Sequence, residues 1–164
     1  MPYNFGFADA VHGSLAQQRQ VEIISNNLAN VSTPGYKTDR MLFNDLMGRQ
    51  VYSVMEQGPM EVTDQPLDFG IRGDGFFQVR TKNGIRLTRA GAFEMDSEGL
   101  LRTPAGDPVL GAGSGTITLN PNGGRPYVDE EGGIHQDGEV VGQIGVVEVV
   151  DLNNLEKEGL NLFS

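Results

Sequence analysis

The stretch Ile24-Ser25-Asn26-Asn27-Leu28-Ala29-Asn30-Val31-Ser32-Thr33-Pro34-Gly35-Tyr36-Lys37 divides this chain into two kinds of sequence. Its three asparagines fall at the end of an apolar-periodic segment. Asparagine is a mediocre helix former, but its amide can bond backbone groups or a neighbouring helix. Pro34 cannot continue a helix, and Gly35 permits a turn that other residues resist. A helix that carries amides along its side and then stops sharply indicates part of an assembly rather than a reaction centre.

The segment before this stretch predicts a helix over residues 7–31. Its apolar residues share a heptad-like seam, which two neighbouring apolar residues widen. The seam positions are Phe7, Val11, Val21 and Leu28. Such a helix gains most of its stability by packing its apolar face, either on its own domain or on another subunit. Polar residues between the seam positions, and the change of composition that follows, favour another subunit.

The remainder of the chain predicts a mainly β fold. Only five of the 23 glycines precede residue 59, and after it short apolar runs alternate with glycine turns. Turns at this spacing are typical of an irregular β-sandwich or barrel-like domain. Residues 144–150 form the most apolar run and are expected to be the central strand. The sequence therefore divides into a helical assembly segment (1–36), a connector (37–60) and a β-rich outer domain (61–164). In the connector, residues 41–52 indicate a short helix or mixed structure.

Composition excludes several classes of partner and site. The chain has 164 residues, a net charge of -10 and no cysteine. The acidity opposes binding to nucleic acid or to an acidic membrane surface. The lack of cysteine rules out disulfides and thiolate metal sites. Because no apolar run is long enough to cross a bilayer and no signal peptide is evident, we expect no membrane insertion, and export, if any, by a route that needs no such signal.

The motifs that could carry chemistry are better explained as turns. The glycines of residues 70–75 do not have the spacing of a nucleotide-binding loop, and a strand follows them instead of a helix. The acidic clusters at 96–99 and 129–132 lack the alternating ligands of a calcium loop. His12 and His135 lie in different regions, and no Ser/His/Asp arrangement is evident. We expect no cofactor, no metal site and no enzymatic activity.

Several blocks of the chain resemble the bacterial flagellar rod and hook protein family. They run in family order over nearly the whole length and together are highly specific. The matching blocks are residues 25–37, 65–77, 87–93, 142–147 and 155–163. Within the family, the short connector between Tyr36 and Leu67 and the ending at 156–159 favour a proximal rod subunit, with a distal rod or hook-type subunit as the alternative.

The resemblance implies a structural subunit of the basal-body rod, which spans the periplasm and serves motility. Its implied partners are itself, other rod subunits and the flagellar export apparatus. It also implies a helical inner layer with the β domain facing outward. Family members continue into a C-terminal helix that pairs with the N-terminal one, whereas this chain stops at Ser164. We expect truncation rather than a different mode of assembly.

These inferences combine into a hypothesis about assembly through the N-terminal helix. The seam would pack against neighbouring helices, and the asparagine amides would bond across those contacts and fix their register, as a buried polar residue does in a coiled coil. The predicted interface residues are Phe7, Val11, Val21, Asn26, Asn27, Leu28 and Asn30. The competing hypothesis is a monomeric β-domain binding module with a helical leader.

Overall fold

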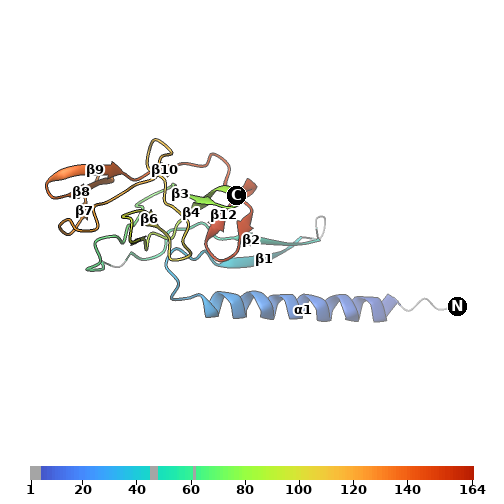
Figure 1. The fold of residues 1–164 in the computed structure, drawn as a ribbon. Helices are drawn as coiled ribbons and strands as arrows, with labels where there is room; N and C mark the ends of the chain where they lie inside the picture. The colour runs from blue at the N-terminus through green and yellow to red at the C-terminus, as the bar shows by residue number, and fades with distance from the viewer. Residues whose placement is uncertain (1–4, 45–47, 61) are drawn as a thin grey trace. The chain divides into compact units, whose positions relative to one another are not determined.

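The computed structural model describes residues 5–44, 48–60 and 62–164. The chain forms two compact units. One, the N-terminal unit, comprises Met1–Thr33 and Lys37–Met55, and the other, the β unit, comprises Pro34–Tyr36 and Glu56–Ser164. The fold is mostly β with one N-terminal helix and several small sheets, as the sequence predicts (Figure 1).

The N-terminal unit consists of a helix and a β-hairpin. Helix α1 spans Phe5–Ala29, and the strands β1 (Asp39–Asn44) and β2 (Gly48–Ser53) pair antiparallel. The helix predicted over residues 7–31 is therefore confirmed, with both ends displaced by two residues towards the N-terminus. Contacts between α1 and β1 hold the helix on the hairpin.

The hairpin corrects the prediction of a helix or mixed structure over residues 41–52. Apolar residues at 42, 43, 46 and 47 have helical spacing, of which Leu46 and Met47 lie outside the described residues. What decides the structure is cross-strand pairing, in which Met41 lies opposite Val51. Such pairing joins residues too far apart for a helical-spacing window to detect.

The largest sheet of the β unit has the strand order β10-β3-β4-β12-β11. Its strands are β3 (Phe76–Thr81), β4 (Gly84–Thr88), β10 (Val146–Val147), β11 (Lys157–Glu158) and β12 (Leu162–Phe163). The β3–β4 hairpin and its turn at Gly84 confirm the sequence prediction. Figure 1 shows this sheet beside the chain's C-terminal end.

Two smaller sheets complete the β unit. One pairs β5 (Glu94–Met95) with β6 (Leu101–Arg102), and the other has the order β7 (Tyr127–Val128), β8 (Gly133–Gln136), β9 (Glu139–Gln143). A 3-10 turn, η1, spans Leu152–Asn154. Isolated bridges, such as Val79 with Val109 and Gly111 with Ile144, connect the segments between the sheets.

The prediction that residues 144–150 form the central strand is wrong. Only Val146 and Val147 are in a strand, and β10 lies at the edge of its sheet. Val146 is 45% exposed and Val150 is 105% exposed. A run of β-branched residues reports strand propensity but does not say how many partners the strand will have. From this run, only Ile144 joins the core cluster.

The core of the β unit is assembled from many short segments. Phe77 and Phe93 form an edge-to-face pair with ring centroids 5.2 Å apart, an arrangement that aromatic rings favour. The buried cluster comprises Phe77, Val79, Phe93, Leu101, Val109, Ile117, Leu119, Ile134 and Ile144. Because its members come from several small sheets and bridges, the core rather than one continuous sheet holds the unit together.

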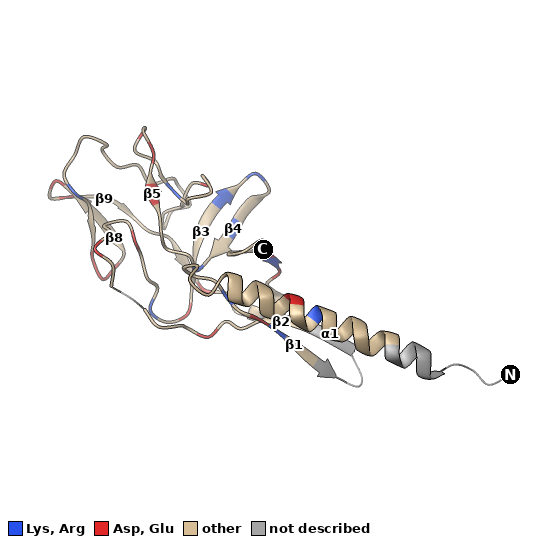
Figure 2. Ribbon diagram, turned by 90° about the horizontal axis from the view of Figure 1, so that it is seen from below, with Lys and Arg blue, Asp and Glu red and all other residues tan. Residues whose placement is uncertain are grey.

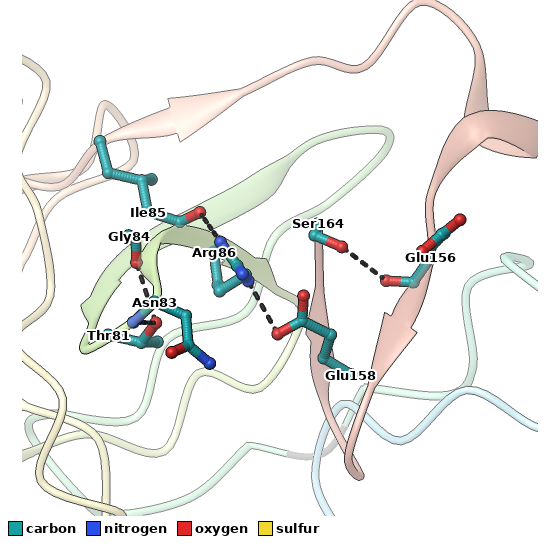
Figure 3. Close-up of polar contacts among 8 residues, drawn as sticks. All are labelled: Thr81, Asn83, Gly84, Ile85, Arg86, Glu156, Glu158 and Ser164. Atoms are coloured by element: carbon teal, nitrogen blue, oxygen red, sulfur yellow. Dashed lines mark hydrogen bonds and ion pairs between the residues drawn. The ribbon is translucent and has the colours of Figure 1, made fainter.

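The C-terminal hairpin is bound into the largest sheet. Strand β12 pairs with β4, and Phe163 is fully buried with its ring centroid 5.8 Å from that of Phe76. Arg86 Nε donates to Glu158 Oε2 at 2.9 Å (Figure 3). This hydrogen bond lowers the pKa of Glu158. The final residues are therefore an integral part of the β unit.

Candidate assembly interface

Helix α1 presents two different faces. Ala16 is buried, and Ile23 and Asn27 are half-buried, at positions 7 and 4 residues apart that share one side of a helix. Val21 and Leu28, also 7 apart, lie on another side and are 60% and 71% exposed. The first face therefore packs within the N-terminal unit, and the second remains open to a partner.

The open side forms a stripe of large apolar side chains. Val21, Ile24 and Leu28 are 60%, 56% and 71% exposed, and Val11 at 41% lies further along the helix. From Val11 onward, Arg19 and Glu22 are the charged residues of α1, so the stripe is almost uncharged (Figure 2). We name Val11, Val21, Ile24 and Leu28 the α1 stripe. Exposed apolar patches mark interaction sites, so this stripe is a candidate contact surface.

The amide of Asn27 holds the hairpin on the helix. Its Nδ2 donates to the carbonyl oxygen of Asp39 at 2.9 Å, and its Oδ1 accepts from the Asp39 amide at 3.0 Å. The Asp39 carboxylate in turn accepts from Ser53 Oγ at 2.6 Å, across the start of the hairpin. One side chain thus satisfies both backbone groups of the first residue of β1. We call this pair of hydrogen bonds the Asn27–Asp39 clamp.

The other two asparagines lie at the helix end. Asn30 Nδ2 donates to the carbonyl oxygen of Asn26 at 2.8 Å, and Asn30 Oδ1 accepts from Thr33 Oγ1 at 3.3 Å. The Asn26 carbonyl oxygen also accepts from the backbone amide of Asn30 at 3.2 Å, so the Asn30 side chain adds a second hydrogen bond to the last turn of the helix. The Asn26 side chain is exposed.

The Pro-Gly-Tyr part of the motif is anchored separately in the β unit. Gly35 has a φ of 70°, and a Cβ there would collide with the backbone of Ala90. Asn161 Nδ2 donates to the carbonyl oxygen of Pro34 at 3.4 Å, and Lys157 Nζ lies 4.3 Å from the ring centroid of Tyr36. Glycine is therefore required at this position by conformation and by space.

The structure places the predicted interface residues on α1, or in the case of Asn30 directly after it, in different environments. Val11, Val21, Leu28 and Asn26 are exposed, Asn27 and Asn30 have partners within the chain, and the side chain of Phe7 lies outside the described residues. Sequence reasoning missed Asp39 as the partner of Asn27. No local pattern marks it, because the bond uses the Asp39 backbone and so carries no side-chain signal.

The groups that might have carried chemistry serve as turns and local pairs. In the turn after β5, Asp96 Oδ1 accepts from the amides of Glu98 and Leu100, each at 2.9 Å. Asp129 Oδ1 does the same for Glu131 and Gly133, and its Oδ2 lies 2.7 Å from His135 Nε2. That bond to His135 lowers the pKa of Asp129.

Neither a metal-ligand cluster nor a membrane-spanning helix is found in the residues that the structure describes. Within these residues, no group of three or more His, Asp or Glu side chains is placed to hold a metal ion. No helix in the described part of the chain is long and apolar enough to cross a membrane.

Comparison with known proteins identifies the family. The model of the flagellar hook protein FlgE/F/G D1 domain matches residues 70–142, and that of the flagella basal body rod proteins matches residues 10–37. The flagellar basal-body rod protein FlgF of Caulobacter vibrioides is 35% identical, over 94% of this chain and 72% of its own length. FlgF of Mesorhizobium japonicum is 32% identical, over 84% of this chain and 62% of its own length.

A second kind of rod protein is almost as similar. The flagellar basal-body rod protein FlgG of Bacillus subtilis is 31% identical, over 89% of this chain and 67% of its own length. The chain thus spans between 62% and 72% of the length of these three relatives. The rod-protein match covers most of α1 and the asparagine motif, and the D1 match covers most of the β unit. This chain therefore belongs to the family of flagellar basal-body rod and hook proteins.

Proposed function

We propose that this chain is a structural subunit of the flagellar basal-body rod, and that it polymerises through the α1 stripe into the axial shaft used for motility. The observation that carries this proposal is the exposure of Val21 and Leu28, at 60% and 71%, on a helix whose other side already packs on its own hairpin. A solvated monomer gains nothing from such a stripe, whereas a neighbouring helix would bury it.

Burial of the stripe would contribute favourably to assembly. Burying an exposed Val, Ile or Leu side chain contributes about 1.5–3 kcal/mol. The large residues of the stripe therefore supply several kcal/mol per copy, before the entropy of association is subtracted. If the contact joins different surfaces on successive copies and does not close, repeating it generates a helical filament.

The asparagines take different parts in this proposal. Phe7, Val11, Val21 and Leu28 would form the apolar contact, and Asn26 would offer its amide across it. Asn27 and Asn30 would support the contact from within the chain, by fixing the hairpin and the helix end. A structural role of this kind needs no catalytic group and no cofactor.

Among rod subunits we favour the proximal type, with the distal type as the alternative. FlgF relatives reach 35% identity, and the FlgG relative of Bacillus subtilis reaches 31%. The short connector before Leu67 also favours the proximal type. Residence in the rod, with passage through the flagellar export apparatus and without membrane insertion, forms part of the same proposal.

The test places a charge on the stripe. A strain that carries Val21→Asp with Leu28→Asp should lose motility and should lack rods in isolated basal bodies. Gln20→Asp is the matched control, because Gln20 is an exposed polar residue of the same helix, and it should leave motility unchanged. Circular dichroism of the purified chains should show equal helix content. Normal rods in the doubly substituted strain would refute the proposal.

A further inference from the structure

The β7–β8–β9 sheet exposes an apolar face that is built in register. Tyr127 lies opposite His135 on β8, and His135 lies opposite Val140 on β9, so the three share one face. The rings of Tyr127 and His135 stack with centroids 4.7 Å apart and planes 5° apart. Tyr127 is 57% exposed and Val140 is 64% exposed. The neighbouring pair, Val128 and Ile134, faces the opposite side of the sheet, where Ile134 is fully buried in the core.

Negative charge predominates around this face. Residues 125–143 include five acidic side chains and one basic side chain, that of Arg125, which donates to the carbonyl oxygen of Asp64. Asp129 is held in place by its backbone hydrogen bonds and by His135, and the adjacent Glu130 and Glu131 are exposed. Figure 2 shows acidic positions along this end of the β unit. We name Tyr127, His135, Val140 and their acidic neighbours at 129–131 the acidic face.

The β3–β4 hairpin has the opposite character. Residues 76–88 include Arg80, Lys82 and Arg86 and no acidic side chain. Arg86 is neutralised by Glu158 at 2.9 Å (Figure 3). Within the described residues, neither Arg80 nor Lys82 forms an ion pair. Ile85 lies opposite Arg80 and is 47% exposed. We name Arg80, Lys82 and Ile85 the basic tip.

The turn that carries the basic tip is well fixed. Thr81 Oγ1 donates to the carbonyl oxygen of Gly84 at 2.9 Å and accepts from the amide of Asn83 at 3.2 Å (Figure 3). Arg80 is exposed, and its guanidinium donates to the carbonyl oxygen of Ser114 at 3.1 Å. The basic tip is thus ordered before any partner arrives, which reduces the entropy cost of binding.

We propose that the acidic face of one copy binds the basic tip of a second copy. Each surface pairs an exposed apolar residue with charge, and the charges are of opposite sign, so the two are complementary in both respects. Two acidic faces would repel each other, which disfavours a contact between the acidic faces of two copies. Where such a contact between two different surfaces does not close into a ring or a two-fold pair, it propagates from copy to copy. The inference deepens the proposed function, on which it rests, by adding a contact between β units to the contact between helices.

The lack of cysteine in this chain permits a clean cross-linking test. Two versions of the full chain, Asn83→Cys and Val140→Cys, are expressed together in the motile cell and treated with a short thiol cross-linker, because Asn83 is exposed beside Lys82 and its replacement leaves the charge of Lys82 in place. A dimer that contains one copy of each version is expected. Ser97→Cys replaces Val140→Cys in the control, because Ser97 is exposed in the turn between β5 and β6.

Charge reversal gives an independent readout. Lys82→Glu alone, or Glu131→Lys alone, should lower the yield of cross-linked dimer by about tenfold, because each sets like charges against each other. The two reversals together should restore the yield, which a merely structural defect would not permit.

A yield no higher than in the Ser97→Cys control, a cross-link from Val140→Cys to a different protein, or a failure of the paired reversal to restore the yield would each overturn the inference. The proposed function is judged separately by the helix variants. If rods are lost only when Val21 and Leu28 carry charges, the proposed function stands, even if no cross-link between β units forms.

Discussion

Replacing Asn27 by alanine should release the hairpin from the helix without unfolding the β unit. The substitution removes both hydrogen bonds of the Asn27–Asp39 clamp. A single hydrogen bond contributes about 0.5–1.5 kcal/mol net, so the loss amounts to about 1–3 kcal/mol. Alanine is a better helix former than asparagine, and therefore any loss of stability cannot come from helix propensity.

Hydrogen exchange measures this loss where it occurs. A loss of about 1–3 kcal/mol corresponds to roughly 5- to 150-fold faster exchange of protected amides through local opening. The amide of Asp39, which donates to Asn27 Oδ1, should change most. Amides of the core strand β3 should keep their protection, because β3 belongs to the other unit.

Two further variants separate the clamp from other effects. Asn26→Ala changes an exposed amide on the same turn and should leave exchange in β1 unchanged. Asn27→Asp keeps an acceptor for the Asp39 amide but loses the donor to its carbonyl, and should give an intermediate effect. If the Asp39 amide exchanges at the same rate in Asn27→Ala as in Asn26→Ala, the clamp does not hold the hairpin and the reasoning fails.

Two other predictions concern the β unit. Gly35→Ala should lower the free energy of unfolding by more than Gly106→Ala, because both require a positive φ, which costs about 1–2 kcal/mol in alanine, but only the first collides with Ala90; equal thermal unfolding midpoints would contradict this. The His135 bond lowers the pKa of Asp129, so this carboxylate stabilises the fold above its ordinary pKa and stops doing so as the pH falls through the lowered value. Asp129→Asn should therefore flatten the loss of stability in acid titrations, and an unchanged slope would refute this assignment.

The parts of the fold that follow from local sequence were predictable. The apolar period of α1 and the glycine turn between β3 and β4 are both encoded within a few residues, and both are confirmed. The two failures concern partners distant in sequence. Val146 lies in an edge strand because, among the described strands, β10 pairs only with β3, and Met41 lies in a hairpin because β1 pairs with β2. Strand propensity and helical spacing carry no information about that partner.

The predicted interface shows the same division. The exposure of Val21 and Leu28 could be inferred from the sequence, because a heptad-like seam with polar interruptions indicates a face that seeks a partner. The partner of Asn27 could not. Its amide bonds the backbone of Asp39, 12 residues away, and a backbone group looks the same in every sequence. Amide-rich motifs therefore indicate that hydrogen bonds form, without indicating whether they form within or between subunits.

This distinction changes how the asparagine motif should act in a rod. Asn27 and Asn30 are engaged within the N-terminal unit, where they fix the hairpin and the helix end. Asn26 and Leu28 are exposed on either side of Asn27. Successive side chains of a helix point in different directions. Asn27 can therefore hold the hairpin while its neighbours in sequence, Asn26 and Leu28, face a partner. If the α1 stripe forms the contact, as we propose, loss of Asn27 would weaken assembly indirectly, through a loosened hairpin, whereas loss of Leu28 would weaken the contact itself while leaving the hairpin protected from exchange.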